Sequence, residues 1–186
     1  MARTESNMMP LGTQAPAFLL PDTVSSTDKT FVDIKGNKGT VVMFICNHCP
    51  YVIHVQDEIV KIANEYAEKG LGFVAISSND VENYPDDSPE LMKEHADKYG
   101  FSFPYLYDES QEIAKAYQAA CTPDFYVFDG SDACVYRGRM DPSTPGNNQP
   151  VTGEDLRRAL DMLVDGLPID RGQFPSMGCN IKWKAN

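Results

Sequence analysis

The sequence predicts an α/β fold in which a central mixed β-sheet is flanked by helices on both faces. Three observations carry this prediction. Strand-like apolar runs alternate with segments of helical periodicity over most of the chain. The run Val41–Ile45 is apolar throughout, as expected of a strand buried on both faces. Alternating runs at Phe125–Phe128 and Cys134–Arg137 surround Asp129-Gly130, which predicts a closing hairpin.

The first half of the chain supplies strands around one long helix. Short strands are expected at Ala17–Leu20 and Thr30–Ile34, because polar turn residues bound each run. After the buried strand, apolar residues recur at helical spacing until Gly70, which predicts a helix over Pro50–Lys69. Phe73–Ser77 is expected to form the next strand.

The second half continues the alternation. Ser88 is expected to cap a helix that runs to about Tyr99. A short strand at Pro104–Tyr107 and a short helix at Ser110–Ala119 follow. The last helix is expected at Leu156–Val164, after a cap-like segment at Thr152–Asp155.

The 186 residues are expected to form a single domain, because no repeat or linker divides them. Within residues 1–186, the core is expected at 10–166, with an N-terminal β extension. Residues 167–186 are expected to form an irregular C-terminal tail. The polar loops Asp80–Asp87 and Asp141–Asn148 lack the spacing of a calcium loop and are interpreted as solvated surface.

Composition narrows the functional classes. A net charge of −11 argues against partners with anionic surfaces, so we expect no nucleic acid and no membrane partner. The N-terminus lacks the apolar core of a secretory signal, and a cytoplasmic location is expected. Five cysteines are an odd set, and in a reducing compartment such residues are more often buried or catalytic than bridged.

Cys49 is the strongest candidate for chemistry. It precedes Pro50, a residue suited to the first position of a helix. Unpaired backbone N–H groups at a helix start favour an anion, so the pKa of a thiol placed there is lowered. We therefore expect Cys49 to be a nucleophilic thiolate; the structural alternative is a core-facing cysteine.

Several motifs then resemble one known family. They are Ala15–Asp22, Phe44 with Cys49-Pro50, Phe103-Pro104 with Asp108, and Thr122–Phe125. These motifs, and the order of elements over residues 10–166, resemble the thioredoxin-like superfamily, in its peroxiredoxin-like and TlpA-like branch of AhpC/TSA-type redoxins. Asn47–Tyr51 and Gly178–Trp183 resemble a group of uncharacterised peroxiredoxin-like proteins. The resemblance implies a thioredoxin-like fold and thiol redox chemistry, and no cofactor is expected.

The register of this resemblance matters for mechanism. Cys49 lies five residues beyond Phe44 and so matches the first cysteine of thioredoxins, whereas Val52 stands at the second. The Cys46-x-x-Cys49 pair therefore sits three residues early, on the loop before the helix. Met43 replaces the buried acid of thioredoxins, and the peroxiredoxin Pro-x-x-x-Thr-x-x-Cys signature is absent.

The resemblance also implies that Thr122-Pro123 holds a cis peptide bond facing Cys49. The Thr122 backbone would then pair with a bound substrate. Cys121 and Cys46 are competing candidates to resolve a mixed disulfide on Cys49, and packing alone would also explain Cys121. The expected substrate-binding residues are Thr122, Pro123, His48 and Pro50.

His48 and Cys179 each have two interpretations. His48 could lower the pKa of the adjacent thiol or protonate a leaving thiolate, but it could also simply face solvent. Cys179 could resolve Cys49 of a second subunit in a homodimer, or lie buried in a docked tail. Cys134 is expected in the core. A zinc site of Cys46, His48 and Cys49 is chemically conceivable but lacks a paired motif, and no metal is expected.

The sequence thus predicts a thiol–disulfide oxidoreductase in which Cys49 attacks first. Its partners would be a disulfide-bearing protein or small thiol substrate and an external dithiol reductant. The alternative is a thiol-dependent, antioxidant peroxidase in which Cys49 becomes a sulfenic acid. A third hypothesis is a non-catalytic binding module that uses the same groove.

Overall fold

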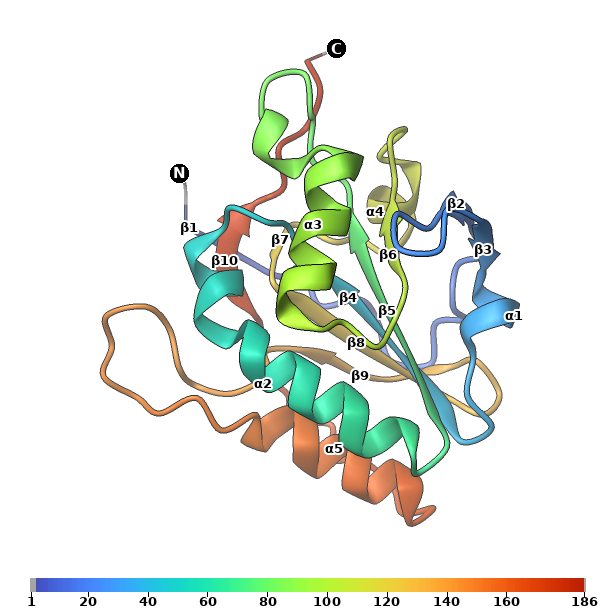
Figure 1. Ribbon diagram of the computed structural model, residues 1–186. Coiled ribbons are helices and arrows are strands. Elements are labelled where there is room, and N and C mark those ends of the chain that lie inside the picture. The colour runs from blue at the N-terminus through green and yellow to red at the C-terminus, as the bar shows by residue number, and fades with distance from the viewer. Residues whose placement is uncertain (1–2, 186) are drawn as a thin grey trace.

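The computed structural model describes residues 3–185, in which strands and helices alternate along the chain (Figure 1). The strands are β1 (Arg3–Glu5), β2 (Leu19–Pro21), β3 (Asp28–Thr30), β4 (Gly39–Phe44), β5 (Leu71–Ser77), β6 (Tyr105–Tyr107), β7 (Cys121–Thr122), β8 (Asp124–Asp129), β9 (Cys134–Gly138) and β10 (Met177–Asn180). The helices are α1 (Phe31–Ile34), α2 (Pro50–Ala67), α3 (Pro89–Tyr99), α4 (Glu112–Ala116) and α5 (Glu154–Val164), with a short 3-10 helix, η1 (Pro85–Asp87).

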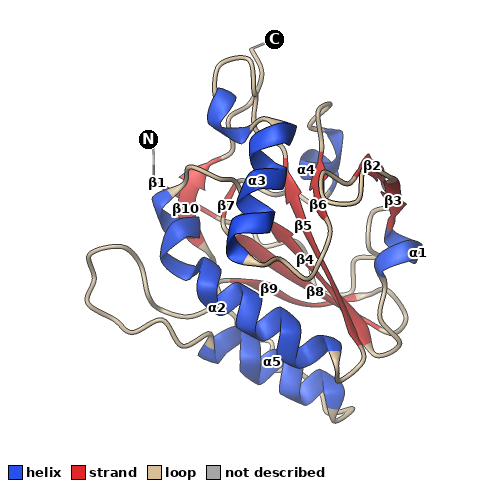
Figure 2. Ribbon diagram, viewed as in Figure 1, coloured by secondary structure: helices blue, strands red, loops and turns tan. Residues whose placement is uncertain are grey.

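Five strands form the central sheet, in the order β6-β5-β4-β8-β9 (Figure 2). β4, β5 and β6 run parallel, whereas β8 and β9 form the antiparallel hairpin that the Asp129-Gly130 pattern predicts. The predicted mixed sheet is therefore confirmed. In its register Phe44 lies opposite Asp124, which brings the segment after β4 next to the segment before β8.

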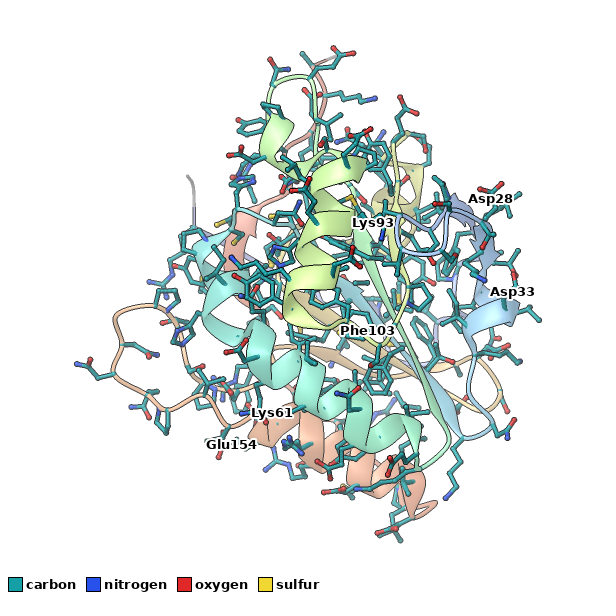
Figure 3. All side chains as sticks on the ribbon, in the orientation of Figure 1. Asp28, Asp33, Lys61, Lys93, Phe103 and Glu154 are labelled. Carbon is teal, nitrogen blue, oxygen red and sulfur yellow. The ribbon has the colours of Figure 1, made fainter. Side chains whose placement is uncertain are left out.

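Two apolar layers cover the faces of this sheet, and β4 contributes to both by alternation. Val41 and Met43 face a core that includes residues of α2, α3 and α5. Val42 and Phe44 face a second core, which contains residues of α1 and α4. In Figure 3 the labelled Lys61 of α2 and Glu154 of α5 lie on the side where these two helices run together.

The segment expected as a strand at Thr30–Ile34 is mostly a helical turn, and that prediction was wrong. Thr30 ends β3 and caps α1, because its side chain accepts from the Asp33 N–H while the Asp33 carboxylate accepts from the Thr30 N–H. This reciprocal pair is a capping box, which favours a helix over an extended chain. Phe31 is buried by the turn.

The tail is more ordered than expected, because it contains β10. This strand lies between β1 and β7 in a separate three-stranded sheet, with Cys179 opposite both Arg3 and Thr122. Long-range pairing of this kind joins two ends of the sequence and leaves no local pattern. In Figure 1, β10 lies beside the first turn of α2.

The two polar loops are not simply solvated, which corrects the sequence interpretation. Asp80, Asp87 and Asp141 are buried. Asp141 accepts hydrogen bonds from the backbone N–H groups of Thr152 and Gly153 at 2.8 and 2.7 Å, just before α5. Its carboxylate satisfies donors near the helix start that would otherwise be unpaired. Within residues 3–185, no helix combines the length and apolar character that crossing a bilayer requires.

Candidate active site

Cys49 is the N-cap residue of α2, and Pro50 occupies the first helical position. The chain leaves the buried strand β4, passes through five residues and enters the helix, as the sequence pattern predicts. Proline suits this position because its missing N–H would have no partner there. The thiol is therefore held at a junction between two rigid elements.

The Cys49 sulfur contacts two other parts of the chain. Its Sγ lies 3.3 Å from the carbonyl oxygen of Thr122 and 2.7 Å from the Sγ of Cys179. The Thr122-Pro123 peptide bond is cis, as the resemblance implied. Cys49 is fully buried and belongs to the first core, as the structural alternative of a core-facing cysteine predicts.

Neighbouring groups lower the pKa of Cys49 to about 5. The largest cause is a hydrogen bond with the Cys46 thiol; burial opposes it, and Cys179, Thr122 and the Val52 backbone add smaller contributions. The sequence suggested the helix start as the cause, but here neighbouring thiols matter more. A low-pKa thiol is ionised at neutral pH and is the reactive form.

The other thiols keep their protons. Hydrogen bonding to Cys49, with burial, raises the pKa of Cys46 well above its ordinary value, and its Sγ lies 3.5 Å from Thr122 Oγ1. Burial raises the pKa of Cys121, whose Sγ points toward the Pro123 carbonyl. Cys134 lies in the second core, and burial raises its pKa to about 11. Cys49 is thus the thiol of this group that favours ionisation.

His48 is held by a buried carboxylate. Its Nδ1 lies 2.7 Å from Asp87 Oδ2, and this interaction is the main reason that the pKa of His48 is raised. Asp87 also accepts hydrogen bonds from the Asn47 N–H and from Asn79 Nδ2, each at 2.8 Å. No local pattern indicates this role of Asp87, because the residue lies in an acidic loop far along the chain from His48.

Cys46, His48 and Asp87 offer potential metal-ligating atoms within 4.8 Å of one another. However, both Asp87 oxygens already accept hydrogen bonds from protein donors. The burial of this carboxylate is accounted for by those donors and by His48, so we propose no metal here.

Asp124 is a second buried acid beside the site. It follows Pro123 directly and is fully buried, with the Tyr126 hydroxyl donating to its Oδ2 at 2.8 Å. Burial raises its pKa to about 7. The sequence offered one missed signal, an acid directly before the apolar run Phe125–Phe128.

A pocket of about 380 Å³ lies next to Pro123. Arg3 and Glu5 of β1, Tyr51 of α2 and Met177 of β10 are among the residues that line it. Cys49 is not among them. Because Met177 lines the pocket while Cys179 contacts Cys49, β10 borders both places.

The Cys49 thiolate should dominate the pH titration of the protein's thiols. We expect the ultraviolet thiolate absorbance of the wild-type protein to rise with a midpoint near pH 5. Cys49→Ser should remove this step, whereas Cys134→Ser should retain it. A Cys49-dependent midpoint at about 8.5, the ordinary cysteine value, would contradict the assignment.

Asp124 should make stability depend on pH. Its folded-state pKa of about 7 lies above the ordinary carboxyl value of about 3.9, so the folded state holds the proton more tightly. Its contribution to stability is therefore present below about pH 4 and is lost as pH rises to about 7. The free energy of unfolding of Asp124→Asn, relative to wild type, should rise over that window and then level off. Urea titrations at several pH values measure it, and a pH-independent difference would refute the prediction.

The chain is similar to known proteins in both structure and sequence. The chain is 57% identical to an uncharacterized conserved protein from Geobacillus kaustophilus, whose crystal structure superposes with a TM-score of 0.98 over 100% of this chain and 98% of that one. A thioredoxin family protein from Chlorobium tepidum, described as a thiol:disulfide interchange protein, superposes with a TM-score of 0.64 at 18% identity, covering 84% and 99% of the two chains. This likeness confirms the predicted thioredoxin-like fold.

A curated relative adds sequence similarity. Thiol-disulfide oxidoreductase ResA from Halalkalibacterium halodurans is 29% identical over 132 residues, which cover 69% of each protein. The model of the AhpC/TSA family matches residues 11–136, more than half of the chain. The chain therefore belongs to the AhpC/TSA family.

Proposed function

We propose that this protein is a thiol–disulfide oxidoreductase in which Cys49 is the nucleophile. The observation that carries the proposal is a thiol of low pKa at the start of α2, 3.3 Å from the Thr122 carbonyl. The thiolate attacks one sulfur of a substrate disulfide and forms a mixed disulfide, while the other substrate sulfur leaves as a thiolate. The similarity to ResA supports the same reaction class.

The surrounding residues have defined roles in this proposal. Pro123 lines the pocket beside the site, and Pro50 fixes the helix start. The Thr122 backbone, expected from the sequence to pair with substrate, pairs with β10 instead. His48, whose pKa Asp87 raises, supplies a proton to the leaving thiolate. A second thiol resolves the mixed disulfide, and Cys46 is close enough to share hydrogen bonding with Cys49.

The partners are proposed from the chemistry. The substrate is a disulfide-bearing protein or a small thiol compound in its oxidised form, and an external dithiol restores the reduced enzyme. A cytoplasmic location remains a prediction from the sequence, as does the absence of membrane and nucleic-acid partners.

A second candidate is an antioxidant thiol peroxidase, which the burial of Cys49 favours because a peroxide is small. The Cys49 thiolate would take one oxygen from the peroxide to become a sulfenic acid, with release of an alcohol or water. A second thiol would then displace water from the sulfenic acid and leave a disulfide.

Reduction of insulin by dithiothreitol tests the main proposal. We expect the wild-type protein to accelerate it and Cys49→Ser to return the rate to background, because the attacking sulfur is gone. Cys134→Ser, whose thiol lies in the other core, is the matched control and should retain the rate.

Peroxide consumption, measured on the same proteins, separates the two candidates. Cys49-dependent consumption with a trapped sulfenic acid, and without insulin reduction, would favour the peroxidase. Cys49→Ser with full activity in both assays would refute both.

A further inference from the structure

The edge of strand β7, which contains Thr122, is already paired with another strand of the same chain. β10 pairs antiparallel with β7, with Cys179 opposite Thr122 and Asn180 opposite Cys121. An extended peptide binds a sheet by adding a strand to an edge with free backbone groups. Here that position is taken by residues from the tail, as Figure 1 shows for β10 beside β7 and the start of α2.

The pairing of β10 with β7 brings the sulfur of Cys179 into contact with the sulfur of Cys49. The Sγ atoms of Cys49 and Cys179 are 2.7 Å apart, and a disulfide bond measures about 2.05 Å. Bond formation therefore needs an approach of less than about 1 Å. Of the other two thiols near the site, Cys46 hydrogen-bonds to Cys49, with its Sγ 3.5 Å from Thr122 Oγ1, and therefore competes with Cys179. Cys121 instead lies 3.9 Å from the Pro123 carbonyl.

The tail is anchored on both sides of Cys179. At Gly178 a β-carbon would stand 2.0 Å from the Thr122 carbonyl oxygen, so only glycine allows this close approach. Beyond the strand, Lys182 donates its N–H to Asn79 Oδ1, and its carbonyl accepts from Gln111 Nε2 at 2.9 Å. These contacts hold the Cys179 thiol in register with Cys49.

We propose that Cys179, delivered by β10 of the same chain, is the residue that resolves the mixed disulfide on Cys49. The proposal rests on the function proposed above and replaces Cys46 and Cys121 in that step. It also makes the resolving reaction intramolecular, in contrast to the homodimer considered from the sequence.

The electrons balance without any further reactant. The Cys49 thiolate attacks a substrate disulfide, and the first substrate thiolate leaves with a proton from His48, which solvent then reprotonates. The Cys179 thiol then gives up its proton and attacks Cys49 Sγ, which releases the second substrate sulfur to accept that proton. The substrate gains two electrons and the Cys49–Cys179 pair loses two, and the external dithiol reverses this oxidation.

The charge on Cys49 affects the pKa of Cys179 before the first step but not after it. Burial raises the pKa of Cys179 to about 12, and the hydrogen bond and charge of Cys49 add to that effect. Once Cys49 is a neutral mixed disulfide, its negative charge no longer opposes ionisation of Cys179. The first step thus removes the two smaller of these three effects on the Cys179 pKa, and the effect of burial remains.

The experiment uses the reduced full-length protein with one equivalent of the chromogenic disulfide dithiobis(nitrobenzoate), and follows release of thionitrobenzoate. Wild type should release two equivalents, the first by attack of Cys49 and the second by resolution. Cys179→Ser should stop at one equivalent and retain the other as a mixed disulfide, visible by mass spectrometry. Cys134→Ser is the matched control and should release two.

Each alternative outcome has a definite meaning. If Cys179→Ser still releases two equivalents, and Cys46→Ser or Cys121→Ser stops at one, this inference is overturned while the proposed function stands. If Cys49→Ser releases as much as wild type, the proposed function itself fails.

Two further measurements test the proposal even if Cys179→Ser does not fold. Peptide mapping of the oxidised wild-type protein needs no substitution and should join Cys49 to Cys179. Gly178→Ala should push β10 off Thr122, so the first release should become faster and the second at least tenfold slower. Gly172→Ala, where a β-carbon meets only the Asp170 side chain at 3.4 Å or beyond, is the matched control and should behave as wild type.

Discussion

The contact between the Cys49 sulfur and the Thr122 backbone is the constraint on which the site depends. It arises from sheet register, because Phe44 at the end of β4 pairs with Asp124 at the start of β8. The loop that leaves β4 and the loop that enters β8 must therefore meet at one edge of the sheet. The cis peptide at Pro123 and the helix start at Pro50 then fix the two partners at 3.3 Å.

Of the four cysteines near Thr122, Cys49 is the one whose thiol has a lowered pKa, and the neighbouring thiols account for that. Cys46 and Cys179 hold their protons and hydrogen-bond to Cys49, which compensates for the loss of solvent around the thiolate. The five cysteines of the sequence thus divide by environment. Cys134 is a small apolar residue of the second core, whereas the others gather around Thr122 and Pro123.

The sequence predicted those elements whose formation depends on residues close to one another in the chain. The apolar strand, the helix after Pro50, the Ser88 cap and the hairpin were predictable because each depends on residues close in sequence. The strand β10 was not, since it exists only through pairing with β1 and β7. The local pattern indicated Cys49, and the family resemblance added Thr122 and Pro123. Neither could rank Cys179 or find the buried Asp87.

The amide of Asn79 connects the tail to the imidazole beside the nucleophile. Its Nδ2 donates to Asp87, the carboxylate that holds His48, while its Oδ1 accepts from the Lys182 N–H. Departure of the tail would leave that oxygen without its donor and free the amide to turn away from Asp87. Tail docking and His48 protonation are therefore thermodynamically linked, and each must influence the other to the same extent.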